Sequence, residues 1–322
     1  MLKDVFLLTV DQIAVFLAFF LVGLLLGKWK ILPEGAGATL SRLVLYVFLP
    51  GMTFISFAEQ CTVEKLGNYA LMLAAGSVAL LLLLPLGHVV QRRFPGTGTD
   101  KLTALYSMVF PNFGYIGYPL VAALYGQAFL SQFMMFGLPF TVCAYAYMVR
   151  KWMPAGQSLR GRNVWGQVLN PSVVAILLGA MWGVLQLPIP QVLDNICEAA
   201  SDCVYVCPMI LTGFSISRIS LRQALLEKRA YGISAIRLLA LPAVLSCLVF
   251  VVSRAMGVDG AFLLVIGTFM AMPLGMNPVV FCETYGKDGT FGAECAFISL
   301  LMSVATLPVM VGLQNYLAGL LG

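Results

Sequence analysis

Long runs of apolar residues, each wide enough to cross a lipid bilayer, dominate this sequence. Only 10% of its 322 residues are charged and 60% are hydrophobic, whereas ordinary globular domains have about 25% charged residues. At roughly 23 residues for each spanning helix, ten helices use about 230 residues and leave about 90 for loops and ends. The sequence therefore predicts an all-α membrane protein without a soluble domain. This composition excludes a secreted disulfide module, a nucleic-acid-binding protein and a disordered chain.

The apolar runs predict ten transmembrane helices. A basic polar stretch from Arg150 to Arg162 divides the chain nearly in half, which predicts a first five-helix unit at 1–150, a cytoplasmic linker at 151–164 and a second five-helix unit at 165–322. The predicted spans are 5–27, 37–59, 67–90, 101–125, 129–150, 165–187, 190–217, 229–253, 260–285 and 290–315.

The basic residues predict the orientation of the chain, because cytoplasmic loops carry an excess of Lys and Arg. With the N-terminus outside, three basic residues (Lys3, Lys65 and Arg254) fall on the outer side and fourteen fall in cytoplasmic loops. We therefore expect a multi-pass protein of the cell inner (plasma) membrane with both termini on the outer side. The fourteen are Lys28, Lys30, Arg92, Arg93, Lys101, Arg150, Lys151, Arg160, Arg162, Arg218, Arg222, Lys228, Arg229 and Lys287.

The two halves share an internal pattern. Span 4 reads VFPNFGYIGYPLVAALYG and span 9 reads TFMAMPLGMNPVVFCETYG. In each, a Phe is followed nine residues later by a Pro, and Tyr-Gly closes the segment (Phe110 and Pro119; Phe269 and Pro278). Proline pairs also link spans 2 and 7, 3 and 8, and 5 and 10. Because each half has an odd number of helices, the two copies would be inverted in the membrane.

Spans 4 and 9 concentrate residues that break helices. Proline removes a backbone donor and glycine loosens the chain, and unwound backbone at membrane depth is tolerated where protein or a water-filled cavity surrounds it. Paired broken helices in inverted halves indicate a transporter binding site, and half-helix N-termini attract anions. The alternative is that Gly and Pro only allow close helix packing. The predicted substrate-binding residues are Asn112, Gly114, Gly117, Pro119, Pro273, Gly275, Asn277 and Pro278.

The segment from Pro111 to Leu120, PNFGYIGYPL, resembles the N-x-G-x-x-G-x-P-L signature of the auxin efflux carrier family of membrane transporters. The resemblance extends over nearly the whole chain. Weaker matches are Leu49-Pro50, Asn170-Pro171, Pro208, Arg237 with Leu241-Pro242, and Met272-Pro273 with Tyr285-Gly286.

This resemblance implies two inverted five-helix repeats whose spans 4 and 9 cross at their breaks. It implies a scaffold of spans 1, 2, 6 and 7 and a transport unit of the other six. It also implies transport of small organic anions such as malonate, malate, monocarboxylates or, in plants, auxin. Asn112 matches the family's asparagine at the crossover, which faces the substrate. The segment around Asn277 differs from the family's usual run of small residues.

Two ionisable residues within the predicted spans are candidates for charge coupling, because such groups are functional candidates by default. Arg237 in span 8 either reaches the cytoplasmic surface or balances a carboxylate. Asp194, Glu198 and Asp202 recur every four residues on one helix face. Asp202 is the one expected to be buried, where it either couples a proton to transport or pairs with a cation such as Arg237. Glu283 and Glu294, near span ends, are expected to be solvated.

These features favour a secondary transporter of small carboxylates that works by alternating access. We expect no cofactor, with H⁺ or Na⁺ as coupling ions, and a small carboxylate, the lipid bilayer and a second copy of the chain as partners. A sodium-coupled carrier of larger, bile-acid-like anions and a channel are alternatives. An intramembrane enzyme is disfavoured, because the sequence has no DDxxD-type metal cluster, no paired catalytic Asp, no Cys/His metal spacing and no ATP-binding loop.

Overall fold

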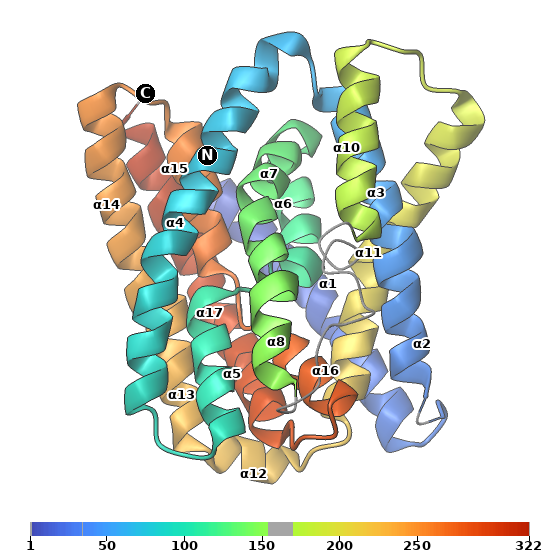
Figure 1. The fold of residues 1–322 in the computed structure, drawn as a ribbon, viewed down its shortest axis with the longest axis vertical. Helices are drawn as coiled ribbons and strands as arrows, with labels where there is room; N and C mark the ends of the chain where they lie inside the picture. Colours follow the sequence, from blue (N-terminus) through green and yellow to red (C-terminus); the bar gives the residue numbers. More distant parts are fainter. Residues whose placement is uncertain (1, 34, 154–169, 322) are drawn as a thin grey trace.

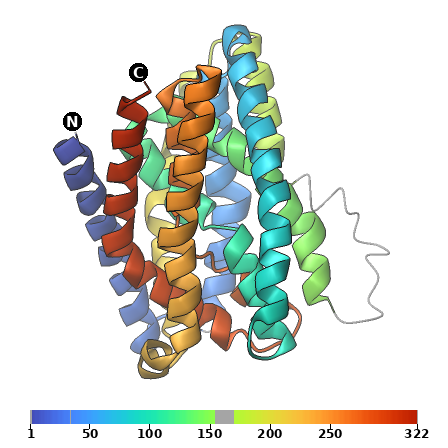
Figure 2. The ribbon, with the colours of Figure 1, turned by 90° about the vertical axis from the view of Figure 1, so that its left-hand side faces the viewer.

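The chain folds into a bundle of helices that run roughly along one common axis (Figures 1 and 2). The computed structural model describes residues 2–33, 35–153 and 170–321, so most of the predicted linker at 151–164 lies outside the described residues. Helices make up the secondary structure of these ranges, and the predicted all-α class is confirmed. Both chain ends lie at the same end of the bundle, opposite the short helix α12 (Leu221–Leu226) (Figure 1).

Seven of the described helical segments are long and apolar enough to cross a membrane. Several combine an α-helix with a π-helical turn that continues it. The seven segments are α1 (Leu2–Lys28); α2 (Ala36–Leu43), η1 (Val44–Phe48) and α3 (Leu49–Gln60); the 3₁₀ turn η2 (Val63–Lys65) and α4 (Leu66–Arg93); α7 (Gln127–Cys143), η4 (Ala144–Met148) and α8 (Val149–Trp152); α11 (Gln191–Ile216); α13 (Lys228–Ala235), η5 (Ile236–Ala240) and α14 (Leu241–Met256); and α17 (Thr290–Gly319).

The remaining predicted spans contain shorter helices. The span predicted at 165–187 contains α10 (Pro171–Val184), and the other two contain interrupted helices. The first interrupted span consists of α5 (Gly98–Val109), η3 (Phe113–Gly117) and α6 (Tyr118–Tyr125). The second consists of α15 (Gly260–Ala271) and α16 (Asn277–Thr284).

Polar caps fix where several helices begin. Thr97 and Asp100 form a reciprocal capping box at α5, with both bonds at 3.2 Å. The Asn170 side chain accepts a hydrogen bond from the Val173 N–H at 3.0 Å, and Pro171 follows at the first helical position of α10. These caps satisfy backbone donors that have no partner within the helix.

Close packing pairs α1 with α11 and α3 with α10. A Cβ atom on Gly213 would collide with the backbone carbonyl oxygen of Phe20, and one on Gly179 would lie 2.5 Å from the carbonyl oxygen of Phe54. Small residues let the helix backbones approach this closely.

The outer faces of the bundle are apolar: Leu81 on α4 is 67% exposed and Val244 on α14 is 66% exposed.

Candidate functional site at two helix breaks

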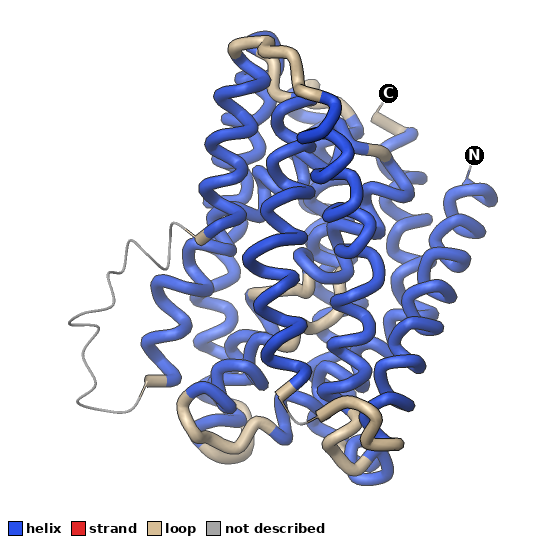
Figure 3. The backbone as a smooth tube through the Cα atoms, turned by 90° about the vertical axis from the view of Figure 1, so that its right-hand side faces the viewer, coloured by secondary structure: helices blue, strands red, loops and turns tan. Residues whose placement is uncertain are grey.

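The two interrupted helices meet at their interruptions, in the interior of the bundle (Figure 3). Helix α5 ends at Val109 and the helix resumes at Phe113, while α15 ends at Ala271 and the helix resumes at Asn277. Pro111 and Leu274 form an antiparallel bridge, and the Asn112 N–H donates to the Pro273 carbonyl at 2.8 Å. The predicted breaks therefore exist, and a carbonyl of the second accepts a backbone hydrogen bond from the first.

Asn112 caps the helix that follows the first break. Its Oδ1 accepts a hydrogen bond from the Tyr115 N–H at 3.4 Å. The residue is 6% exposed, and its amide nitrogen has no hydrogen-bond partner among the described residues. This nitrogen is therefore available to donate a hydrogen bond to a ligand.

The second break is held by different contacts. The Leu274 N–H donates to Ser299 Oγ on α17 at 3.1 Å. The Asn277 side chain crosses to the first broken helix, where its Nδ2 donates to the Tyr106 hydroxyl oxygen at 2.6 Å. The side-chain nitrogen of Asn277 is therefore bound to another described residue, unlike that of Asn112.

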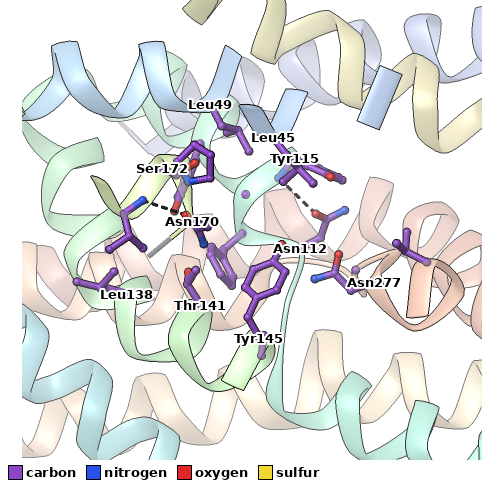
Figure 4. A pocket seen from close by; sticks show the side chains of 18 of the residues that line it. Leu45, Leu49, Asn112, Tyr115, Leu138, Thr141, Tyr145, Asn170, Ser172 and Asn277 are labelled. Atoms are coloured by element: carbon purple, nitrogen blue, oxygen red, sulfur yellow. Dashed lines mark hydrogen bonds between the residues drawn. The ribbon is translucent and has the colours of Figure 1, made fainter. Parts of the chain in front are cut away.

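A cavity of about 820 Å³ lies beside the two breaks. Asn112 and Asn277 lie next to each other on one side of it, and Thr141, Asn170 and Ser172 lie on another (Figure 4). No described residue that lines it is charged. Its lining is Leu45, Tyr46, Leu49, Thr53, Tyr106, Pro111, Asn112, Phe113, Gly114, Tyr115, Tyr118, Met134, Leu138, Thr141, Ala144, Tyr145, Val149, Asn170, Pro171, Ser172, Val173, Ile176, Gly275, Asn277, Val280, Phe281 and Tyr285.

The structure divides the eight predicted substrate-binding residues into two groups. Asn112, Gly114, Gly275 and Asn277 line the cavity. The other four are not among its lining residues. These are Gly117, whose added Cβ would lie 3.1 Å from the Phe133 ring, Pro119 within α6, Pro273, whose carbonyl accepts from Asn112, and Pro278 within α16.

Sequence reasoning missed the tyrosines and the opposite polar side of the cavity. Six tyrosines line it: Tyr46, Tyr106, Tyr115, Tyr118, Tyr145 and Tyr285. A tyrosine in an apolar run looks like an ordinary core residue, because its ring is mostly hydrophobic. The sequence marks Asn170-Pro171 as a match to the family, but only the fold shows that the start of α10 borders this cavity.

The predicted burial of Asp202 is wrong. The helix face that Asp202 shares with Asp194 and Glu198 is only partly covered by the protein: Glu198 is exposed and Asp194 is half-buried. Asp202 is exposed on that face, and its predicted pairing with Arg237 is not formed.

Arg237 does not reach the surface, and no carboxylate of the described residues contacts it. It is fully buried in η5, which packs against α15 and α17. Its Nη1 lies 3.9 Å from Met270 Sδ, and its Nε and Nη2 have no partner in the described part of the chain. The predicted path to the cytoplasmic surface is therefore wrong, and Arg237 is a buried cation away from the cavity lining, whose pairing with a substrate carboxylate stays a prediction.

Glu294 is buried rather than solvated, because all residues from Phe291 to Leu300 on α17 are buried. The side chain of Glu283 lies outside the described part of the structure.

A charged cluster joins loops at the α12 end of the bundle. Arg229 donates to Asp100 at 3.0 Å and to Glu227 at 2.9 Å, and its guanidinium lies 4.6 Å from the centre of the Phe291 ring. The hydrogen bonds from Arg229 hold the pKa of the Glu227 carboxyl below its ordinary range. This cluster fastens the start of α5 to the start of α13 and lies away from the cavity lining.

Comparison with known proteins identifies the family. The family model described as membrane transport protein matches residues 8–311, nearly the whole chain. The chain is also 23% identical, over 309 residues, to an uncharacterised transporter of Methanothermobacter thermautotrophicus, a match that covers 95% of this chain and 98% of that protein. Both findings agree with the resemblance carried by the segment from Pro111 to Leu120. The chain therefore belongs to the membrane transport protein family and is a multi-pass membrane protein.

Proposed function

We propose that this protein is a secondary active transporter of small organic anions, such as malonate, malate or other carboxylates. The substrate would bind in the cavity beside the two helix breaks. The observation that carries the proposal is the side-chain amide of Asn112, which lines the cavity and whose nitrogen donates to no described residue. A carboxylate oxygen would accept a hydrogen bond from it.

The chemistry of the cavity suits a carrier. A carboxylate that leaves water needs hydrogen-bond donors to offset its desolvation. Amide and hydroxyl groups supply such donors here, and the half-helix that begins after Asn112 directs its positive end toward the break. Neutral donors bind a carboxylate less tightly than a buried arginine clamp would. Moderate binding favours release on the far side of the membrane.

We further propose ten transmembrane spans in two inverted five-helix repeats. The seven long helical segments and the three shorter or interrupted ones together account for the ten predicted apolar runs. The antiparallel bridge between Pro111 and Leu274 supports the inversion, because inverted repeats would bring their breaks together in opposite directions.

Alternating access would then move one group of helices against the other. The tight pairs α1–α11 and α3–α10 support a rigid scaffold. The cavity is lined on one side by scaffold residues, such as Leu49 and Ile176, and on the other by Asn112 and Tyr145 of the remaining helices. A cavity between two such units can open to either side as they shift.

We propose that the protein resides in the cell inner (plasma) membrane with both ends on the outer side. The basic loops and the shared end of the two termini support this orientation (Figure 1). We also propose a homodimer, because Asp202 lies exposed near the middle of α11 and a carboxylate facing lipid is costly. H⁺ or Na⁺ coupling remains part of the proposal, and Arg237 is its candidate charge.

A larger organic anion is the second candidate substrate. The cavity volume of about 820 Å³ and its six tyrosines favour it, because pockets of roughly 300–1,000 Å³ hold ligands much larger than malonate. Such a carrier would use the same carboxylate site and fill the remaining space with apolar contacts.

Uptake into proteoliposomes tests the proposal. Labelled malonate, malate, lactate and an aromatic monocarboxylate would be compared for the wild type, Asn112→Ala and the matched control Asn68→Ala, whose side chain is exposed on α4. We expect transport of at least one acid, a loss of more than about 90% in Asn112→Ala, and wild-type uptake in the control. Equal uptake in wild type and Asn112→Ala would remove the cavity from the proposal. Preference for the aromatic acid would select the second candidate.

A further inference from the structure

Tyr106 lies on α5 directly before the first helix break, and its ring is fixed by other aromatic residues. It is 2% exposed. Its ring stacks on Phe110 at 4.7 Å between centroids and meets the edges or faces of Phe281 at 6.0 Å and Trp152 at 6.1 Å. The position of its hydroxyl is therefore set by packing in the interior of the bundle.

The hydroxyl of Tyr106 has a proton to donate. A phenolic hydroxyl carries one proton and can accept hydrogen bonds through its lone pairs. Asn277 Nδ2 donates to the oxygen at 2.6 Å, so that contact uses a lone pair and leaves the proton available. Across the residues that the structure describes, no acceptor bonds this proton, and Tyr106 lines the cavity.

Tyr106 and Asn112 approach the same small region of the cavity. A Cβ atom added to Gly275 would lie 3.9 Å from Asn112 Cα and 4.0 Å from Tyr106 Cε1. Gly275 therefore lies beside the backbone of Asn112 and the ring of Tyr106, whose side chains each have an unused hydrogen-bond donor. A carboxylate group is planar and has two oxygens, so one group can accept from both donors.

We propose that the Tyr106 hydroxyl is the second hydrogen-bond donor to the substrate carboxylate, beside the amide of Asn112, and that Asn277 is a positioning residue for Tyr106. This inference rests on the proposed function. The bond from Asn277 occupies the acceptor side of the hydroxyl and polarises the O–H group, because hydrogen bonds in a chain strengthen one another. An O–H donor to a carboxylate makes one of the stronger hydrogen bonds in proteins.

A double-mutant cycle of substrate KM tests this assignment. Tyr106→Phe removes the hydroxyl and keeps the ring contacts, and Asn277→Ala removes its partner. We expect Tyr106→Phe to raise KM about tenfold or more and Asn277→Ala to raise it by a smaller factor. In the Tyr106→Phe background, Asn277→Ala should change KM less than about twofold, because Asn277 acts through the hydroxyl. If the KM of the double variant rises by the product of the two single-variant factors, Asn277 contacts the substrate itself, and the proposal is overturned.

Tyr125→Phe is the matched control. Tyr125 is not among the cavity-lining residues, and its hydroxyl accepts a hydrogen bond from Asn315 Nδ2 at 2.8 Å, as that of Tyr106 does from Asn277. Its KM should stay within about twofold of the wild type. An unchanged KM in Tyr106→Phe, with the wild type active, would overturn the assignment of Tyr106 and leave the proposed function standing. Lack of transport by the wild type for every acid would instead refute the proposed function.

An isosteric replacement keeps the test decisive if Tyr106→Phe fails to fold. Incorporation of 3-fluorotyrosine at position 106 makes the hydroxyl a stronger donor and a weaker acceptor without removing it. A donor to the substrate carboxylate predicts a lower KM. A higher KM would show that the hydroxyl acts as an acceptor and would overturn the proposal.

Discussion

The two helix breaks look alike in sequence but are stabilised in different ways. Each has a proline at its start and an asparagine near its end. At the first break, the Asn112 side chain caps its own helix through Oδ1 and leaves its nitrogen without a partner in the described residues. At the second, the Asn277 nitrogen is bound by Tyr106 of the other broken helix, and Ser299 on α17 holds the backbone at Leu274.

This difference gives the two asparagines separate proposed roles: Asn112 binds the substrate, and Asn277 positions Tyr106. The first break is satisfied within its own segment and through Pro273, so its asparagine can face a ligand. The second break depends on α5 and α17 for its shape. Substitutions at the first break should therefore act mainly on transport, and substitutions that support the second should act mainly on stability.

Asn112→Asp should have the largest effect on transport. It places a carboxylate beside the expected position of the substrate carboxylate, where two like charges about 4 Å apart repel by about 4 kcal/mol at an effective dielectric of about 20. Uptake at neutral pH should fall by about a hundredfold or more. Asn112→Gln, which keeps the amide, is the charge control. Wild-type uptake by Asn112→Asp would show that no anion approaches the first break.

Gly275→Leu should lower uptake by about tenfold or more, because its side chain would fill the space between Asn112 and Tyr106. Gly275→Ala should retain most of the uptake, since an added Cβ meets its nearest neighbours only at 3.9 Å. The ratio of the two variants, measured at equal amounts of folded protein, reports on this space. Equal uptake by both variants would place the substrate elsewhere in the cavity.

Ser299→Ala should weaken the second break. It leaves the buried Leu274 N–H without its hydrogen-bond acceptor, at a cost of about 1–3 kcal/mol. Thermal unfolding in detergent should show the loss. The control is Ser77→Ala on α4, whose hydroxyl bonds to the Leu73 carbonyl of its own exposed turn. Equal melting temperatures for the two variants would contradict a supporting role for Ser299.

Arg229→Met provides a reference away from both breaks and should have the smallest effect on uptake. Arg229 lowers the pKa of Glu227, so this contribution to folding stability is present above the ordinary Glu pKa of about 4.3. It is lost as the pH falls through the lower pKa of the folded protein. The difference in melting temperature between wild type and Arg229→Met should therefore shrink from pH 7 toward acid, while KM at pH 7 stays unchanged. If the difference in melting temperature stayed constant across this pH range, the Glu227 carboxylate would not be the source of the stability lost in Arg229→Met.

The sequence predicts the breaks well because their causes are local. Pro111 and Pro273 lack a backbone donor, and neighbouring residues cannot restore the helix. By contrast, Pro85, Pro139, Pro208 and Pro308 lie inside continuous helices. A single proline is thus compatible with a helix, and it is the clustering of Gly and Pro that indicates an interruption.

The burial of charged residues was not predictable in the same way. Asp202 and Arg237 both lie well inside apolar segments, yet one is exposed and the other is fully buried. In a membrane protein the outer face is as apolar as the interior, so the hydrophobic pattern of a helix does not indicate which face is covered by protein. Glu294 is expected to be solvated because it lies near the end of a span, but the packing of α17 buries it.

The sequence by itself determined the membrane-embedded helical class, the positions of the apolar segments and the location of the two breaks, because each depends on composition or on short-range backbone chemistry. The tertiary structure decided which break presents a free donor, which tyrosines line the cavity and which charges are buried. These properties depend on contacts such as that between Asn277 and Tyr106, which join residues 171 positions apart. Only the packing of one helix against another brings such groups together.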